Sequence, residues 1–250
     1  MNIILFEEHE IGRPLPDHDP RAVHLLKILH KKTGDTFNAG ILDGKTGKAV
    51  IEKTHNGMVF FSLGLTEEPA PRLPIEIALG FPRPIQLRRI FRDLSSMGVS
   101  KISLFGTDLS EKSYTNTTLL SDGGARSALI EGAVQARDTT LPKVKLYKNA
   151  GEFLCKENLS RKTLITADNI CTQGSFSGVE SGEDGFLIAV GSERGWSDAE
   201  RHLFENAGFC RLSLGARALR TETAAIASTA IALAALNKNV LQDAPKGNYE

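Results

Sequence analysis

The sequence predicts an α/β chain of two domains, a small β-rich one with a single short helix and a larger one built around a mainly parallel sheet. Three observations carry this prediction. Short β-prone runs separated by turn residues fill residues 1–65, prolines crowd residues 66–74, and strand-like and helix-like runs alternate from residue 75 onward. The chain has 250 residues, 41% of them hydrophobic, which is enough to bury a sizeable core.

The first domain is predicted to be a small barrel. Asp43-Gly44 and Asn56-Gly57 lie between its β-prone runs, and both dipeptides are typical of hairpin turns. Residues 23–32 differ, because their apolar side chains recur at helical spacing and so favour one short helix. The predicted strands lie within MNIILF, DTFNAGIL, KAVIEK and MVFFSL.

A proline-rich linker separates the two domains. Pro69, Pro71 and Pro74 each restrict the backbone angle φ and remove a hydrogen-bond donor, so residues 66–74 are expected to be extended. The predicted limits are therefore residues 1–68 for the first domain and 74–250 for the second.

The second domain carries start and stop signals for several helices. Pro84 favours a helix start and Gly98 a helix end, Ser197 and Glu200 form a capping-box pattern, and Gly208 closes the helix that follows. Strands that alternate with such helices give a mainly parallel sheet covered on both faces. The predicted strands are 75–80, 101–106, 143–147, 162–167, 185–191 and 209–215, and the predicted helices are 84–97, 124–138, 198–207 and an Ala-rich run from Thr221.

Composition argues against several classes of protein. The 30 basic and 30 acidic residues cancel, which argues against bulk attraction to nucleic acid but leaves room for local basic patches, Arg21 to Lys32 and Arg83 to Arg92. Three single cysteines without CxxC spacing argue against a zinc site or a disulfide framework and fit a reducing cytoplasm. The first residues match neither a signal peptide nor a membrane anchor, so we expect a cytoplasmic protein that uses no membrane and no metal.

Three polar loops follow predicted strands, namely residues 166–170 (TADNI), 191–197 (GSERGWS) and 214–224 (LGARALRTETA). Ligands of open α/β sheets bind outside the carboxyl ends of the strands, so three such loops at one edge predict a cofactor site. Taken singly, each has a plain alternative. Residues 191–197, here called the glycine loop, match neither a Walker A nor a GxGxxG motif and can be an ordinary turn. Thr221 and Glu222 can simply cap the last helix.

A fourth stretch, residues 130–142 (IEGAVQARDTTLP), carries Glu131, Gln135 and Arg137 on a helix of small residues that ends before Pro142. Its periodicity alone favours a solvated helix face.

These stretches together resemble a known family. EGAVQARDTTLPKV, AVGSERGWSDAE and LSLGARALRTETA are similar, in this order, to the signature blocks of the bacterial small-subunit (16S) ribosomal RNA uracil-N3 methyltransferases, which belong to the SPOUT superfamily of knotted methyltransferases. HLLKILHKKTGD resembles the RNA-binding domain of that family, and SEKSY (110–114) resembles the block after its second strand. The likeness covers nearly the whole chain.

One part of the glycine loop departs from the family pattern. It reads Gly191-Ser192-Glu193-Arg194-Gly195 where the family usually has Gly-Pro-Glu-Gly-Gly. If the fourth position required a positive φ, Arg194 would be strained there.

The resemblance implies a fold, a cofactor and partners. The fold is a PUA-like β-barrel followed by an α/β domain with a C-terminal trefoil knot, through which the Ala-rich helix would thread. The cofactor is S-adenosyl-L-methionine, the protein acts as a homodimer, and the partner is 16S ribosomal RNA or the small ribosomal subunit. The implied cofactor-binding residues are Thr166, Ala167, Val190, Gly191, Ser192, Gly195, Leu214, Gly215, Leu219, Thr221, Thr223 and Ala224.

The implied reaction moves a methyl group from a sulfonium to N3 of a uridine. This nitrogen must first lose its proton, and it lies on the pairing edge, so the base has to be unpaired or flipped out. The resemblance assigns charge stabilisation to Arg220 and leaves the proton acceptor open between Glu193 and Glu222. The implied RNA-binding residues are Arg21, His24, Lys27, Lys31, Lys32, Arg83, Arg88 and Arg137.

Two other classes of function remain open at this point. One is a nucleotide-binding oxidoreductase that uses residues 191–195 as a phosphate loop, against which the missing GxGxxG motif counts. The other is a non-catalytic RNA-binding protein on the same fold, which the altered glycine loop favours.

Overall fold

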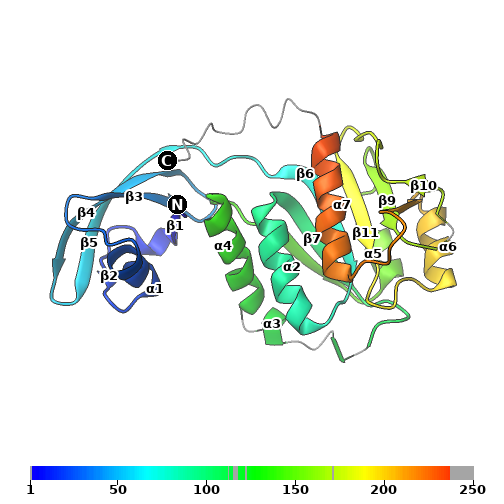
Figure 1. Cartoon of the computed structure of the whole chain (residues 1–250), viewed down its shortest axis with the longest axis horizontal. Helices are drawn as coiled ribbons and strands as arrows, with labels where there is room; N and C mark the ends of the chain where they lie inside the picture. Colours follow the sequence, from blue (N-terminus) through cyan, green and yellow to red (C-terminus); the bar gives the residue numbers. More distant parts are fainter. Residues whose placement is uncertain (1, 112, 115–117, 122, 171, 237–250) are drawn as a thin grey trace. The chain divides into compact units, whose positions relative to one another are not determined.

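The computed structural model describes residues 2–111, 113–114, 118–121, 123–170 and 172–236 (Figure 1). Backbone contacts divide the chain into two compact units, unit one with residues 1–71 and 130–141, and unit two with residues 72–129 and 142–250. Residues 130–141 group with unit one because Val134 O accepts a hydrogen bond from Ile3 N (3.4 Å) and Ala133 packs against Ile3 and Leu5. The sequence predicted domain limits of 1–68 and 74–250. The compact units do not test whether these ranges fold independently, so the domain limits stay a prediction.

Unit one contains β1 (Ile4–Phe6), η1 (Glu8–Glu10), β2 (Leu15–Pro16), α1 (Pro20–Val23), η2 (His24–Ile28), β3 (Thr36–Ile41), β4 (Thr46–His55) and β5 (Met58–Glu67). Its strands form a curled sheet in the order β1-β3-β4-β5-β2, in which only the β1–β3 pair is parallel (Figure 1). Asn56 and Gly57 have φ angles of 49° and 70° and form the predicted turn between β4 and β5. β1 and β2 are edge strands, so in the described part of the chain the predicted barrel is a half-barrel.

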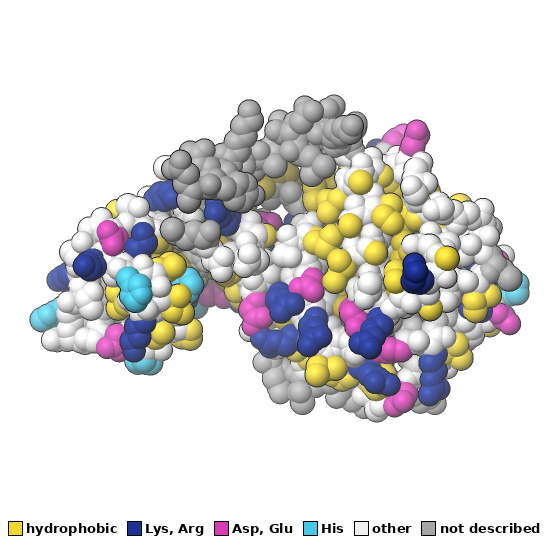
Figure 2. Space-filling view, in the orientation of Figure 1, with side chains coloured by type: hydrophobic (Ala, Val, Ile, Leu, Met, Phe, Trp, Pro, Cys, Tyr) yellow, Lys and Arg dark blue, Asp and Glu magenta, His cyan; other side chains and the backbone are white. Residues whose placement is uncertain are grey.

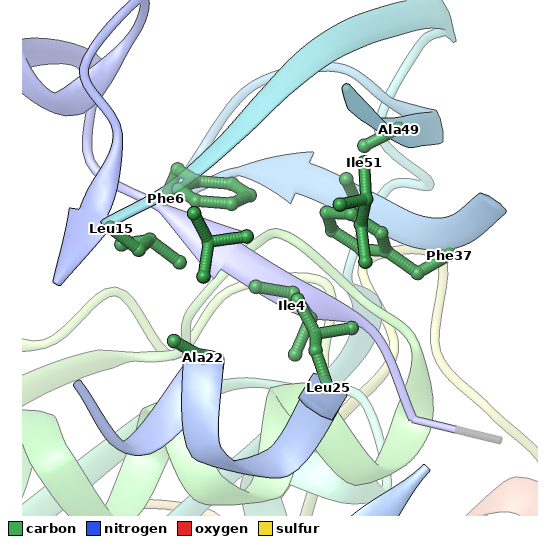
Figure 3. Packing of buried hydrophobic residues seen from close by; sticks show 10 residues of the cluster. Ile4, Phe6, Leu15, Ala22, Leu25, Phe37, Ala49 and Ile51 are labelled. Carbon is green, nitrogen blue, oxygen red and sulfur yellow. The ribbon is translucent and has the colours of Figure 1, made fainter. Parts of the chain in front are cut away.

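The core of unit one lies between the curled sheet and the short helical segment (Figure 3). Alternating residues of β4 supply it, because Ala49 and Ile51 are buried while Val50 and Glu52 are exposed. The labelled side chains in Figure 3 point toward one another, and they are Ile4, Phe6, Leu15, Ala22, Leu25, Phe37, Ala49 and Ile51.

The helical segment of unit one begins earlier than the sequence predicted. The predicted range was 23–32, whereas α1 and the π-helical turn η2 together cover residues 20–28. Asp19 caps the start by accepting a hydrogen bond from Arg21 N (2.8 Å), and Pro20 suits the first helical position. His30, at φ 51°, lies beyond the end of the helical segment. Local capping chemistry therefore outweighed the apolar spacing.

Unit two contains β6 (Leu73–Gly80), α2 (Pro84–Ser96), β7 (Val99–Phe105), α3 (Thr118–Ser121), the first part of α4 (Gly124–Ala136), β8 (Lys143–Tyr147), α5 (Ala150–Lys156), β9 (Thr163–Ala167), β10 (Gly174–Ser175), β11 (Phe186–Val190), α6 (Asp198–Asn206), β12 (Cys210–Ser213) and α7 (Thr221–Ala235). The rest of α4, from residue 130, groups with unit one. The strands form one sheet in the order β10-β12-β9-β11-β6-β7-β8, and every pair is parallel, as predicted.

Helices cover both faces of this sheet (Figure 1). α2 and α7 pack together on one face, and α5 and α6 pack together on the other. The α5 and α6 face holds an aromatic core in which Phe105, Phe153, Trp196 and Phe204 contact one another. This arrangement confirms the predicted layers.

Predicted helix signals correspond to observed ends in α2 and α6. Pro84 is the first residue of α2, and Gly98 follows its end with φ 80°. Ser197 and Glu200 form the capping box of α6. α5 was not predicted, because its seven residues are too few for a helical period to stand out, although Asn149 caps it through a bond from Glu152 N (2.9 Å).

α7 is the predicted Ala-rich helix. Ala224, Ala225 and Ala232 are buried, and their small side chains let α7 lie close to α2 and to the strands beneath. Within the described residues, neither α7 nor any other helix is long and apolar enough to cross a bilayer.

Candidate functional site

Three neighbouring strands of unit two end at one pocket. β12, β9 and β11 are adjacent and parallel, and Ala167 at the end of β9 pairs with both Val190 and Leu212. The loops that follow these strands lie at the same edge of the sheet, as the sequence predicted. Together with the start of α7 they line a pocket of about 300 Å³.

Most of the residues predicted to bind a cofactor line this pocket. Those that do so are Ala167, Val190, Gly191, Ser192, Gly195, Leu214, Gly215, Leu219, Thr221 and Ala224. Among the predicted catalytic residues Glu193 lines it, whereas Arg220 and Glu222 do not. Whether these residues bind or act on a ligand stays a prediction.

Thr166 and Thr223 were predicted to bind the cofactor but do not line the pocket. Thr166 pairs with Ala189, which belongs to the aromatic core, so strand geometry places the buried Thr166 side chain on that face of the sheet. Thr223 is exposed on α7, because helical spacing puts Thr221 and Ala224 on one side and Thr223 on another.

The glycine loop is a tight turn that tolerates an arginine. Ser192 O accepts a hydrogen bond from Gly195 N (2.9 Å), and Gly195 takes a φ of 72°. A side chain at Gly191 would come within 3.0 Å of the Gly195 carbonyl carbon. Arg194 does not have a positive φ, so an arginine occupies this position of the loop without backbone strain.

Two buried hydroxyl groups fasten this loop to its surroundings. Thr221 Oγ1 donates to Gly191 O (3.2 Å), and Thr107 Oγ1 donates to Ser192 Oγ (3.1 Å). Thr221 therefore does not cap α7, which corrects the plain reading of the sequence. Arg220 holds the capping position instead and makes no side-chain capping bond there.

A buried ion pair shapes the loop after β9. The side chain of Asp168 is 2% exposed and accepts hydrogen bonds from Arg201 Nε (2.7 Å) and from the backbone N of Asn169 (2.7 Å). Arg201 also binds Asp198 (2.8 Å). Its bond to Asp168 raises the pKa of the Arg201 guanidinium, which stays charged. Asp168 lies in the loop after β9 that the sequence predicted to belong to the site. Its partner Arg201, 33 residues away, has no sequence feature that predicts this ion pair.

Trp196 is a buried residue of the pocket lining. It is 2% exposed and donates from Nε1 to Ala167 O (3.1 Å), which joins the loop after β11 to the end of β9. Glu200 ties a further loop to α6 by accepting bonds from Asp108 N (3.0 Å) and Ser197 N (2.9 Å), and burial raises the pKa of its carboxyl group. Hydrogen bonds thus join the loops at this edge of the sheet to one another and to α6.

The mouth of the pocket combines apolar and charged groups. Ile170 and Leu219 line it and are 50% and 40% exposed. The charged residues that line the pocket as a whole are Asp168, Glu193, Arg194, Arg201 and Arg217, of which Asp168 and Arg201 form the buried pair. Such a lining can hold a ligand that has a flat apolar ring and charged ends.

Glu193 is held by the start of a neighbouring helix. Its Oε1 accepts a hydrogen bond from the backbone N of Arg83 (2.8 Å), the residue that precedes α2. Arg83 Nε in turn donates to the hydroxyl group of Tyr114 (3.2 Å). Residues predicted for catalysis and for RNA binding therefore meet here. Arg220 is exposed and Glu222 half-buried in the first turn of α7.

Arg21, predicted to bind RNA, is occupied within unit one. Its guanidinium has five N–H groups, and it makes five hydrogen bonds, to Glu10, Asp19 and the Leu5 carbonyl oxygen, at 2.6 to 3.1 Å. Its N–H groups are thus all used within unit one, which gives Arg21 a structural role, and its contact with RNA stays a prediction.

The other predicted RNA-binding residues are accessible. Lys27, Lys32, Arg83, Arg88 and Arg137 are exposed, and His24 and Lys31 are half-buried. Basic side chains gather over α2 in Figure 2. In the part of the chain that the structure describes, no three His, Cys, Asp or Glu side chains are arranged to hold a metal ion.

Proteins similar to this chain cover most of its length. The sequence profile of the RNA methyltransferase domain matches residues 68–233. Ribosomal RNA small subunit methyltransferase E of Treponema pallidum is 38% identical over 244 residues, which cover 94% of this chain and 91% of that protein.

Two solved structures share the fold. A probable rRNA methyltransferase from Porphyromonas gingivalis has a TM-score of 0.76 at 21% identity, with 94% of this chain and 98% of that one covered. Ribosomal RNA small subunit methyltransferase E from Neisseria gonorrhoeae, solved bound to S-adenosyl methionine, has a TM-score of 0.71 at 20% identity, with 92% and 95% covered. The predicted fold class is thereby confirmed.

Proposed function

Because the chain belongs to the family of RNA methyltransferase domains, as its motifs predicted, we propose that it methylates ribosomal RNA of the small subunit at N3 of a uridine, using S-adenosylmethionine. The family and the 38% identical relative support methyl transfer to small-subunit ribosomal RNA. The N3 position rests on the motif resemblance. The single observation in the structure that carries the proposal is the pocket formed by the loops after β9, β11 and β12.

The residues of this pocket fit S-adenosylmethionine. Ile170 and Leu219 offer exposed apolar surface to an adenine ring, and backbone groups of the glycine loop and of Leu214 can bind polar atoms. When bound, the cofactor supplies an electrophilic methyl group. The pocket residues would hold it at the sheet edge, where the Asp168–Arg201 ion pair and the hydrogen bond from Trp196 to Ala167 O join the loops.

Glu193 is the better placed of the two candidate proton acceptors. It lines the pocket and its Oε1 is anchored by Arg83 N, which leaves Oε2 without a hydrogen-bond partner among the described residues. Glu222 does not line the pocket and serves the positive end of α7. We therefore assign removal of the N3 proton to Glu193.

Arg220 would stabilise the negative charge that then develops on the uracil oxygens. It lies between the pocket residues Leu219 and Thr221 and is exposed. A guanidinium suits two oxygens that flank one nitrogen, because its N–H groups form a planar fork. The RNA would be held by exposed basic residues, among them Lys27 and Lys32, and the enzyme would act as a cytoplasmic homodimer.

The proposal is favoured over a non-catalytic RNA-binding protein. The altered glycine loop was the main support for that alternative, and Arg194 occupies the loop without a positive φ. An oxidoreductase lacks support as well, because the glycine loop follows no dinucleotide-binding pattern.

Calorimetry and RNA analysis test the proposed function. We expect S-adenosylmethionine and its demethylated product to bind the purified protein, and NADH not to bind. Mass spectrometry of small-subunit ribosomal RNA from a deletion strain should reveal one uridine that lacks a methyl group, and the protein should restore it. Absence of cofactor binding, or an unchanged methylation pattern, would contradict the proposal.

A further inference from the structure

Two arginines at the pocket have no partner among the described residues. Of the charged residues that line it, Asp168 and Arg201 bind each other and Glu193 binds Arg83 N. Arg194 and Arg217 are exposed, and neither makes a hydrogen bond or an ion pair with any residue that the structure describes. Among the described residues, these two cations of the pocket are therefore unpaired.

These arginines come from two loops that are tied together. Arg194 lies in the loop between β11 and α6, and Arg217 lies in the loop between β12 and α7. The bond from Thr221 Oγ1 to Gly191 O joins the two loops a few residues from each arginine. The two arginines therefore extend from linked loops into one pocket, where a single ligand can meet both.

Arg194 is a cation that the loop itself does not need. The turn is closed by Gly195 N and Ser192 O, and the positive φ falls on Gly195. Where the family that the motifs resemble usually has glycine, this chain has a long side chain that lines the pocket and contacts nothing charged among the described residues. Ligand binding therefore explains the Arg194 side chain better than a contribution to folding does.

The charge balance favours an anionic ligand other than the cofactor. Three arginines and two carboxylates line the pocket, so its lining is net positive. S-adenosylmethionine carries one carboxylate against an ammonium and a sulfonium, so it too is net positive. A positive pocket that holds a positive cofactor attracts a polyanion.

We propose that Arg194, with Arg217, binds a phosphate group of the RNA backbone beside the target nucleotide. This inference rests on the proposed function and names a positioning contact for it. Guanidinium groups bind phosphate through paired hydrogen bonds, and phosphate contacts set the register of a nucleic acid on a protein. The contact would hold the strand while the target base enters the pocket.

The test compares Arg194→Ala, Arg194→Gly and Arg194→Lys with the wild type and a matched control. Lys143→Ala is the control, because it removes an exposed positive charge from the amino end of β8, at the opposite end of the strands from the pocket. Three quantities are measured for each protein, namely affinity for S-adenosylhomocysteine by calorimetry, affinity for an unmodified 16S ribosomal RNA transcript as a function of salt, and single-turnover methylation.

Arg194→Ala and Arg194→Gly should weaken RNA binding about tenfold, the scale of one lost charge-assisted hydrogen bond or more. The slope of log affinity against log salt should fall by about 0.9, the value for one lost phosphate contact. S-adenosylhomocysteine affinity should stay within about twofold, since no cofactor contact is removed. Arg194→Lys should keep the slope but recover only part of the affinity, because lysine is a point charge.

Two results would overturn the inference. A loss of S-adenosylhomocysteine affinity with an unchanged salt slope would show that Arg194 binds the carboxylate of the cofactor. An unchanged affinity for both RNA and S-adenosylhomocysteine would show that Arg194 binds neither of them. Failure of the proposed function gives a different pattern, in which the wild type itself does not methylate, while the salt slopes still report on Arg194.

Discussion

At the scale of single residues, Arg220 is the sharpest test of the proposed chemistry. Arg220→Ala should lower the methylation rate about a hundredfold, as expected when one preorganised charge-stabilising donor is lost. The fold should survive, because Arg220 is exposed and makes no capping bond to α7. Single-turnover kinetics at saturating cofactor and RNA, beside a thermal melt, measure both effects.

Arg220→Lys should rescue the rate poorly if the planar fork contacts two oxygens. If Arg220 only supports the loop, the alanine variant should instead melt earlier and bind cofactor less tightly, with a saturated rate near that of the wild type. That second pattern would exclude Arg220 from the chemistry.

The same scale shows what a sequence can and cannot reveal about a site. Gly191, Gly195 and Gly215 were found because glycine at strand ends is a visible pattern, and all three line the pocket. Asp168 and Arg201 were missed as a pair, because nothing in a sequence links two charges 33 residues apart. Thr166 does not line the pocket, and a sequence does not show this, because the side-chain direction of a strand residue depends on sheet pairing.

At the scale of elements, the junction between α7 and the glycine loop depends on Thr221. Thr221→Val keeps the shape of the side chain but removes the hydroxyl group that donates to Gly191 O, so a buried carbonyl loses this partner. We expect a loss of about 1–2 kcal/mol in unfolding free energy and weaker binding of S-adenosylhomocysteine. Urea unfolding and calorimetry measure the two quantities.

Thr223→Val is the matched control for that junction. Thr223 lies in the same turn of α7 but is exposed. The unfolding free energy of the Thr223→Val variant should therefore differ from that of the wild type by less than about 0.5 kcal/mol. Equal losses for the two variants would mean that helix propensity, and not the bond to Gly191, sets the stability of this region.

Element boundaries follow the strength of the local signals. α2 and α6 were placed well because proline, glycine and a capping box mark their ends. α1 and η2 began three residues early because Asp19 and Pro20 start the helix before the apolar pattern does. α5 was invisible because seven residues hold barely two turns.

At the scale of the whole molecule, acid should weaken unit one at the ion pairs that Arg21 makes with Glu10 and Asp19. Hydrogen bonds from Arg21 lower the pKa of Glu10 and of Asp19 from their ordinary values of 4.5 and 3.8. Lowered carboxyl pKa values mean that the ionised groups stabilise the fold at neutral pH. That stabilisation is lost as the pH falls below the ordinary values and through the lowered ones.

Arg21→Gln should therefore cost about 2 kcal/mol at pH 7 and flatten the fall in stability toward pH 3. The control is Arg161→Gln, because Arg161 also faces two carboxylates, Glu183 and Asp184, but is 62% exposed. An exposed pair of this kind contributes at most about 1 kcal/mol. Thermal melts across this pH range would contradict the account if both variants behaved alike.

The outer side of α7 argues for a second copy of the chain. Hydrophobic side chains gather over α7 in Figure 2, and its residues that are not fully buried include Ile226, Ala227, Ala230, Ile231 and Ala234. A helix that is apolar on all sides is usually covered on all sides. We expect light scattering at micromolar concentration to give about twice the chain mass of 27.1 kDa.

Ala230→Glu should convert that dimer to a monomer, because it places a charge on the apolar side of α7. Ala199→Glu, on the exposed part of α6, should not. A wild type that is monomeric at micromolar concentration would rule out the dimer.

The basic residues of unit one should serve RNA binding and not cofactor binding. Replacing Lys27, Lys31 and Lys32 of unit one with alanine should weaken RNA binding and lower the salt slope by about one per lost contact. Cofactor affinity should stay nearly unchanged, because the pocket is lined by unit two alone. A parallel loss of both affinities would contradict this division.

The strand order of unit two has a consequence for how the chain is made. Ribosomes release a protein from its N-terminus at about 5–20 residues per second, and β9 emerges before β11. In the finished sheet β11 lies between β6 and β9, so β9 cannot join the strands already made until β11 has been translated. The pocket lining runs from Ala167 to Ala224, so a chain interrupted before Ala224 lacks part of the pocket that the finished molecule has.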